Sequence, residues 1–196
     1  MIKVEETEED LLQKIRHGDI VAMKELYYNY SGYLTTVCSR YIVNRDVVRD
    51  VLQDSFIKIF NSINKFEYRG PGALRAWMTR IVVNESLKHL KKENERLEIV
   101  ASAWDLPDII EEEDPDFDDI PTSIILDMIR SLPCGYRTVF NLYVFENKSH
   151  KEIASILKIA EDSSASQLHR AKNILAKKIN EYKSTQRYSY GKSMVK

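Results

Sequence analysis

The sequence predicts an all-α protein in which an acidic flexible linker joins two helical domains, the second with a helix-turn-helix. Apolar residues recur at helical spacing along most of the chain. Only six glycines and five prolines interrupt its 196 residues. Between 97 and 121 this period is lost and acids accumulate. We therefore expect a helical domain at 1–96, the linker at 97–121, a second helical domain at 122–186 and a polar tail at 187–196.

Charge is unevenly distributed along the chain, although the formal net charge is only −1. Residues 55–96 carry nine Lys and Arg against four acids, and residues 163–192 carry seven against one. Residues 98–127 carry eleven acids and no Lys or Arg. Two basic modules on either side of an acidic connector are typical of a protein that binds nucleic acid.

Several classes of protein do not fit this sequence. The acidic start MIKVEETEED is unlike a signal peptide, and no apolar run approaches the roughly 18 residues that cross a bilayer. We expect a cytoplasmic protein without membrane insertion. Cys38 and Cys134 stand alone, so we expect buried small side chains rather than a metal site. Four scattered histidines give no catalytic or metal-ligand spacing, so we expect no enzyme.

Capping residues mark the first two helices. Thr7 and Asp10 resemble a capping box for a helix over 7–17, and Gly18 is its stop. Asp19 can cap a second helix that runs to Tyr41. The tyrosines of this second helix recur at helical spacing, which favours core packing over cofactor binding.

A third helix opens at Asn44 or Asp46. Its apolar side comprises Val47, Val51, Leu52, Ser55, Phe56, Ile59 and Phe60. Its polar side gathers Asp50, Gln53 and Asp54, which form either a solvated face or a surface for a protein partner.

The segment 64–72, NKFEYRGPG, breaks the helical pattern with a Gly-Pro-Gly turn. Phe66 and Tyr68 stand beside Lys65 and Arg69, an arrangement that can hold an unpaired base by stacking. The alternative is that Phe66 plugs the core.

A fourth helix, 73–95, carries apolar residues on two sides and a polar stripe between them. One side comprises Leu74, Met78 and Ile81, and the other Ala76, Val83, Leu87 and Leu90. The stripe, edged by Trp77, consists of Arg80, Asn84, Lys88 and Lys91. A helix enclosed on two sides would hold this stripe rigidly, as a track for phosphates with Asn84 placed to contact a base. The alternative is a solvated face.

The second domain starts with helices on either side of Pro133. We expect Thr122 to cap a helix over 124–132, and a further helix over 135–146. The residues of this further helix that should pack on the following helix pair are Val139, Leu142, Tyr143 and Phe145.

That pair consists of a short helix, 149–157, with Ser149 as its N-cap, five connecting residues, 158–162, and a helix that opens at Ser163. The core face of the second helix is Leu168, Ala171, Leu175 and Ile179. Its outer face is Ser163, Ser166, Gln167, Arg170, Asn173 and Lys177. Small polar residues followed by basic ones suit a helix-turn-helix in the major groove of DNA. A helical hairpin with a solvated face would have the same spacing.

Two blocks of sequence carry a family resemblance. The first, from Asp46, reads DVVRDVLQDSFIKIFNSINKFEYRGPGALRAWMTRIVVNESLKHLKK. The second reads SLPCGYRTVFNLYVFENKSHKEIASIL and is followed by SSASQLHRAK. In this order, on either side of an acidic linker, they resemble the extracytoplasmic-function (ECF) sigma factors of bacterial RNA polymerase over nearly the whole chain.

The resemblance implies a promoter-specificity factor whose partners are core RNA polymerase and promoter DNA. The first domain would dock on the clamp helices of the largest subunit through Asp50, Gln53 and Asp54. It would capture the melted minus-ten element through Asn64, Phe66, Tyr68, Arg69, Arg80, Asn84, Lys88 and Lys91. The second domain would bind the flap of the other large subunit and read the minus-thirty-five element through Ser163, Ser166, Gln167, Arg170, Asn173 and Lys177.

The resemblance also implies that polymerase supplies the metal and the chemistry, so that this chain has no catalytic residue and no cofactor. Many relatives have an anti-sigma partner. Three positions depart from the family pattern: Lys158 replaces a frequent Gly, Ser164 a core-facing Val, and Ala165 a Lys or Arg. The alternatives are a stand-alone helix-turn-helix repressor or activator, in which the stripe would have no function, and a helical adaptor that uses the acidic linker as bait.

Overall fold

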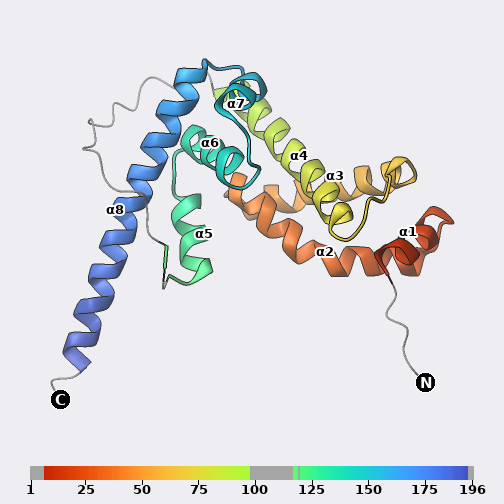
Figure 1. Ribbon diagram of the computed structural model, residues 1–196, viewed down its shortest axis with the longest axis horizontal. Coiled ribbons are helices and arrows are strands. Elements are labelled where there is room, and N and C mark those ends of the chain that lie inside the picture. The colour runs from red at the N-terminus through yellow and green to blue at the C-terminus, as the bar shows by residue number, and fades with distance from the viewer. Residues whose placement is uncertain (1–6, 98–116, 119, 194–196) are drawn as a thin grey trace. The chain divides into compact units, whose positions relative to one another are not determined.

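The computed structural model describes residues 7–97, 117–118 and 120–193, and every regular element in these residues is a helix (Figure 1). The all-α prediction is therefore confirmed. The chain divides into two compact units, Met1–Ala101 and Ser102–Lys196. Most of the predicted linker lies outside the described residues.

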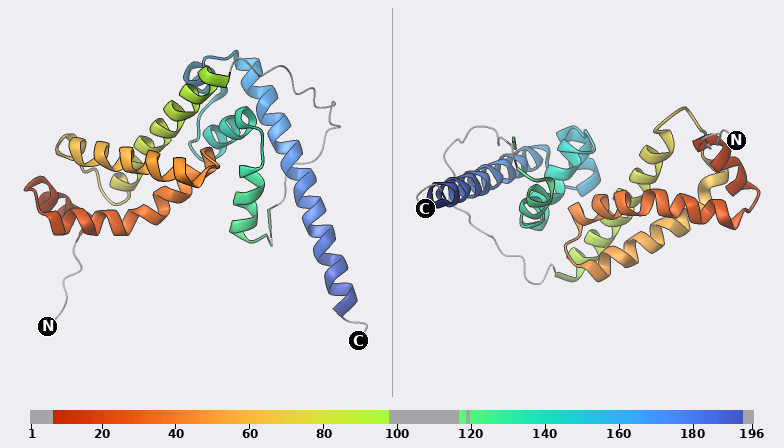
Figure 2. Two further views of the ribbon diagram at one scale, coloured as in Figure 1. Left: turned by 180° about the vertical axis from the view of Figure 1, so that it is seen from behind. Right: turned by 90° about the horizontal axis from the view of Figure 1, so that it is seen from below.

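The described part of the first unit consists of α1 (Glu8–Arg16), α2 (Ile20–Tyr41), α3 (Arg45–Ser62), the short 3-10 helix η1 (Ile63–Lys65) and α4 (Ala73–Leu97). Helices α2, α3 and α4 pack on one another, and α1 packs against α2 and η1 (Figure 2). The largest fully buried side chains of this bundle are Leu12, Leu26, Leu34, Tyr41, Ile59, Ile63, Leu74 and Met78.

Side-chain caps start three of these helices where the sequence predicts them. Thr7 accepts a hydrogen bond from the Asp10 N–H at 3.2 Å, and the Asp10 carboxylate accepts one from the Thr7 N–H at 3.2 Å. Asp19 accepts from two backbone N–H groups of α2, and Asn44 does the same in α3. Gly18, with a φ of 83°, follows α1 in the left-handed conformation that glycine favours.

Helix α4 has one continuous buried face rather than two apolar sides. Val82 and Ser86 are fully buried and fill the angle between the two predicted sides, whereas Ala76 is exposed. The Ser86 hydroxyl donates to the Val82 carbonyl at 2.8 Å, which satisfies this buried polar group. A serine at a core position concealed the continuity of the face in the sequence pattern.

The described part of the second unit contains α5 (Thr122–Arg130), α6 (Cys134–Val144), α7 (His150–Leu157) and α8 (Glu161–Ser193). Helix α8 packs along α5, α6 and α7 (Figure 2). Its predicted core face is confirmed. The buried apolar side chains of these four helices include Ile129, Val139, Leu142, Ile153, Leu168, Ala171, Leu175 and Ile179.

The start of α5 and both ends of α8 differ from the prediction. Pro121, not Thr122, is the N-cap of α5, because the fixed φ of proline suits a helix entry without a side-chain acceptor. Helix α8 begins at Glu161, two residues early, since acids stabilise a first turn. It continues to Ser193, into the segment predicted as a polar tail, because this segment contains no proline.

Candidate nucleic-acid interface

The polar stripe of α4 lies opposite the buried face of that helix. Arg80, Asn84, Lys88 and Lys91 are all exposed, and Trp77 at their edge is half-buried. Packing of α4 against α2 and α3 fixes the helix that carries them. The stripe therefore offers cations and one amide at fixed positions, as a phosphate-contacting surface requires.

Glu85 lies beside the stripe and interacts with two lysines. Its carboxylate forms a salt bridge with Lys58 of α3 and lies 3.8 Å from the ammonium of Lys88. The Glu85 side chain is only 10% exposed. It therefore ties α3 to α4 and offsets part of the charge of Lys88.

In the loop between η1 and α4, fewer of the predicted DNA-binding residues are accessible than the sequence suggested. Phe66 is buried, 8% exposed, and its ring centroid lies 4.8 Å from that of Trp77. The assignment of Phe66 to base stacking is therefore wrong, because a ring packed in the core has no face left for a base. The alternative, that the Phe66 side chain packs in the core, is confirmed.

Other residues of this loop remain accessible. Arg69 of the loop and Asn64 of the preceding η1 are exposed, and Arg69 pairs with Glu67 at 3.1 Å. Tyr68 is half-buried. Desolvation, followed by the negative charges of Glu8 and Glu9, raises the pKa of Tyr68. The Tyr68 hydroxyl can donate a hydrogen bond.

The connection between α7 and α8 has helix-turn-helix geometry. Ser149 caps α7, as predicted, and also forms a capping box with Glu152. Lys158 ends the helix at φ 57° and ψ 44°, the left-handed conformation that glycine adopts most readily. The turn is shorter than predicted, three residues rather than five, because α8 begins at Glu161.

Five of the six predicted residues on the outer face of α8 are accessible. Ser163, Ser166, Arg170 and Lys177 are exposed, and Gln167 is half-buried. Asn173 is a correction: it is 3% exposed, with its amide nitrogen 3.1 Å from His169 Nε2. Three helices, α5, α6 and α7, pack on α8. More of the circumference of α8 is therefore buried in its middle than the single core face that the sequence predicted.

Two residues that the sequence reasoning missed lie at the start of α6. A Cβ on Gly135 would come within 2.9 Å of Gln167 Oε1, so glycine leaves room for that side chain. The Tyr136 hydroxyl accepts a hydrogen bond from Arg170 Nη1 at 3.2 Å. A glycine at the first position of a predicted helix, next to a tyrosine, was the available signal.

A polar contact inside the second unit joins its two helix-turn-helix helices. Ser164 is fully buried, and its hydroxyl lies 3.0 Å from His150 Nδ1. The His150 ring stacks on Tyr143, so the predicted packing of Tyr143 on the helix pair is confirmed, although Tyr143 is 40% exposed. Phe145 is likewise 44% exposed. The departure from a core valine at 164 is thus compensated by a hydrogen bond.

The three residues assigned to polymerase contact lie on one stretch of α3. Asp50, Gln53 and Asp54 are all exposed, at the one-turn spacing that puts them on a common face. This leaves two carboxylates and an amide available to a partner protein.

The described ranges offer no grouping of metal ligands. No group of three His, Cys, Asp or Glu residues there could hold a metal ion. No helix in those ranges has the length and hydropathy to span a membrane.

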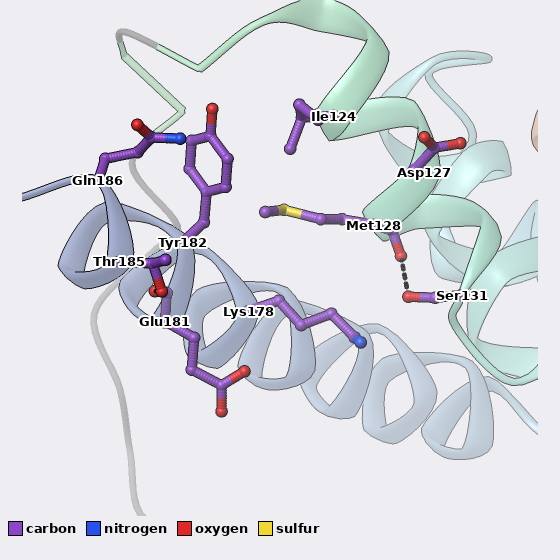
Figure 3. A pocket seen from close by; sticks show the side chains of 9 residues that line it. All are labelled: Ile124, Asp127, Met128, Ser131, Lys178, Glu181, Tyr182, Thr185 and Gln186. Carbon is purple, nitrogen blue, oxygen red and sulfur yellow. Dashed lines mark hydrogen bonds between the residues drawn. The ribbon is translucent and has the colours of Figure 1, made fainter. Parts of the chain in front are cut away.

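A pocket between α5 and α8 combines apolar side chains such as Ile124 and Met128 with Asp127, Lys178 and Glu181 (Figure 3). It contains neither histidine nor cysteine.

Comparison with known proteins identifies both units. The family model of Sigma-70 region 2 matches residues 26–96, and that of Sigma-70 region 4 matches residues 122–175. The ECF RNA polymerase sigma-E factor of Haemophilus influenzae is 29% identical over 183 residues, covering 88% of this chain and 95% of its own. That of Escherichia coli (strain K12) is 27% identical, with 88% and 94% covered. The solved complex of CnrH with the cytosolic domain of CnrY aligns at 20% identity and a TM-score of 0.47, with 87% and 96% covered. The chain belongs to the ECF sigma factors of bacterial RNA polymerase.

Proposed function

We propose that this sigma factor places its two units on separate elements of one promoter while it is bound to core RNA polymerase. It recognises the minus-ten and minus-thirty-five elements and promotes promoter melting. The observation that carries the proposal is the order of the two family matches, each on a unit that exposes its own polar surface. We assign 1–96 to the first element, 122–186 to the second, and 97–121 to the tether between them.

The first unit would hold the melted minus-ten element on the stripe and the adjoining loop. Arg80, Lys88 and Lys91 would contact phosphates, and the Asn84 amide a base edge. The accessible residues Tyr68 and Arg69 of the loop, with Asn64 of η1 beside them, would receive an unpaired base. Support comes from the exposure of all four stripe residues on a helix that is buried along its opposite face.

The second unit would read the minus-thirty-five element from the major groove. Ser163, Ser166, Gln167 and Arg170 occupy the N-terminal turns of α8, the part of a recognition helix that meets base edges. Lys177 lies further along and would contact phosphate. The exposure of these residues and the short turn before α8 support this assignment.

Core polymerase would be contacted by Asp50, Gln53 and Asp54 on α3. We assign no catalytic step to this chain, because polymerase carries out the chemistry of transcription. Its place of action would be the cytoplasm, where polymerase works.

The test is copurification with core polymerase followed by run-off transcription from candidate promoters. Asp54→Asn should reduce recovery of the complex, whereas Glu25→Gln, an exposed acid of α2, should leave it unchanged. Failure of the wild-type chain to direct any initiation with active core would overturn the proposal. A stand-alone helix-turn-helix regulator would instead bind an operator tightly without polymerase.

A further inference from the structure

Helix α1 contacts both ends of the loop that the proposed function assigns to the unpaired base. At the first end, the Arg16 guanidinium donates a hydrogen bond from Nη2 to the Phe66 carbonyl. At the second end, the Glu8 carboxylate accepts from the Gly72 N–H through Oε2 at 3.3 Å. The residues between these points, with Tyr68 among them, are thus fixed from one helix.

Glu8 is itself held in place. Its other carboxylate oxygen, Oε1, accepts a hydrogen bond from the Tyr30 hydroxyl of α2 at 2.7 Å. Gly72 immediately precedes α4, so this carboxylate also lies at the N-terminus of that helix, where a negative charge is favourable. Glu8 therefore links α1, α2 and the start of the helix that carries the stripe.

The backbone of the loop is entropically costly to hold in one shape. Gly70 and Gly72 have φ of 110° and 83°, and glycine pays the largest entropy cost when it is ordered. At its start the Phe66 ring is anchored on Trp77. The contacts from α1 fix the backbone at Phe66 and at Gly72, so that the accessible side chains between them are pre-organised.

We propose that α1 is a positioning element for the base-accepting loop, in which Arg16 and Glu8 set the place where Tyr68 and Arg69 meet the unpaired base. This inference rests on the proposed function. Neither Arg16 nor Glu8 need touch DNA: both act through the loop backbone. Removal of either contact should cost base discrimination at the minus-ten element and leave minus-thirty-five reading unchanged.

The experiment uses the full chain with core polymerase and two families of templates. In one, single bases of the minus-ten element are changed, and in the other, single bases of the minus-thirty-five element. Arg16→Ala and Glu8→Ala should each lower the discrimination ratio at a minus-ten base roughly tenfold, the scale of a lost hydrogen bond to a charged group. Glu8→Gln, which keeps an acceptor, should recover most of it. Gln13→Ala, an exposed substitution in α1, is the matched control.

Amide hydrogen exchange of the free chain gives a second readout. In Glu8→Ala the Gly72 amide should exchange roughly tenfold faster, while buried amides of α2 and α4 keep their rates. Tyr30→Phe, which leaves Glu8 in place without its anchor, should give a smaller effect of the same kind. It also covers the case in which Glu8→Ala loses the fold.

The outcomes separate the two claims. If the wild type directs initiation and discriminates, but both alanine variants keep their minus-ten ratios, the positioning role is overturned and the function stands. An equal loss of discrimination at both elements would also overturn it, since that indicates a general loss of structure. If the wild type directs no initiation, the proposed function fails, whereas unchanged Gly72 exchange in Glu8→Ala overturns the contact itself.

Discussion

The hydroxyl of Tyr136 in α6 accepts a hydrogen bond from Arg170 Nη1 in α8 at 3.2 Å. One residue earlier, Gly135 leaves the space that Gln167 Oε1 occupies. Two of the side chains that we assign to base reading are therefore oriented by the start of a neighbouring helix. The specificity of the recognition helix then depends on residues that need not touch DNA.

Tyr136→Phe should weaken reading at the base contacted by Arg170. Loss of the hydroxyl removes one contact that orients the guanidinium, and a hydrogen bond of this kind contributes about 0.5–1.5 kcal/mol, or roughly two- to tenfold in discrimination. Transcription by the reconstituted holoenzyme from promoters changed in the minus-thirty-five element measures it. Tyr28→Phe, at an exposed tyrosine of α2, is the control. An unchanged base preference would show that the hydrogen bond does not orient Arg170.

Gly135→Ala should alter promoter preference without loss of stability. The new Cβ would displace the flexible end of Gln167, while alanine favours the helix over glycine by about 0.5–1 kcal/mol. Thermal unfolding and the base preference at the position read by Gln167 are measured together. Gly32→Ala, at a glycine of α2 with open space around it, should change neither the promoter preference nor the contacts of its neighbours. An unchanged preference in Gly135→Ala would separate Gln167 from base reading.

The capping box of α7 should respond to acid. Hydrogen bonds from Lys148 and then from Ser149 lower the pKa of Glu152 from 4.5 to about 2. Because this pKa is lower in the folded state, the carboxylate stabilises the fold above about pH 4.5, and the stabilisation is lost as the pH falls toward 2. The unfolding free energy of the wild type relative to Glu152→Gln should shrink over this range.

A carbon-13 NMR titration measures the Glu152 carboxyl directly. Lys148→Gln should move its midpoint upward, because the largest cause of the low pKa is removed. A wild-type midpoint near 4.5 would contradict the capping geometry.

Asn84→Ala and Lys91→Ala should weaken promoter opening in different ways. The amide of Asn84 can discriminate between bases, so its loss should affect some minus-ten sequences more than others. Lys91 offers only charge, so its loss should act uniformly and reduce the salt slope of binding by about one. Opening rates on a set of minus-ten variants, at several salt concentrations, distinguish the two. Equal losses across sequences for both would remove base reading from Asn84.

The starts of four helices were predictable, because local side-chain chemistry decides them. Thr7, Asp19, Asn44 and Ser149 cap the helices that their sequence context indicates. The exposure of the α4 stripe also followed from helical spacing.

The predictions that were wrong concern residues whose surroundings depend on contacts between distant segments. Phe66 was predicted to stack on an unpaired base but is packed on Trp77. Asn173 was predicted on the outer face of α8 but is buried. Helical spacing gives the direction of a side chain and not the number of helices that pack around it. The contacts of Tyr136 and Gly135 with α8 span more than thirty positions of sequence, beyond the reach of any local pattern.

The central claim is that the two units contact separate elements of the same promoter. Photocrosslinking of the holoenzyme tests it most directly, with p-benzoylphenylalanine in place of Ser166 in one preparation and of Arg80 in another. We predict crosslinks from position 166 to the minus-thirty-five element and from position 80 to the minus-ten element of one promoter fragment. Crosslinks from both positions to a single short element, or none to DNA from either in a transcribing complex, would contradict the account.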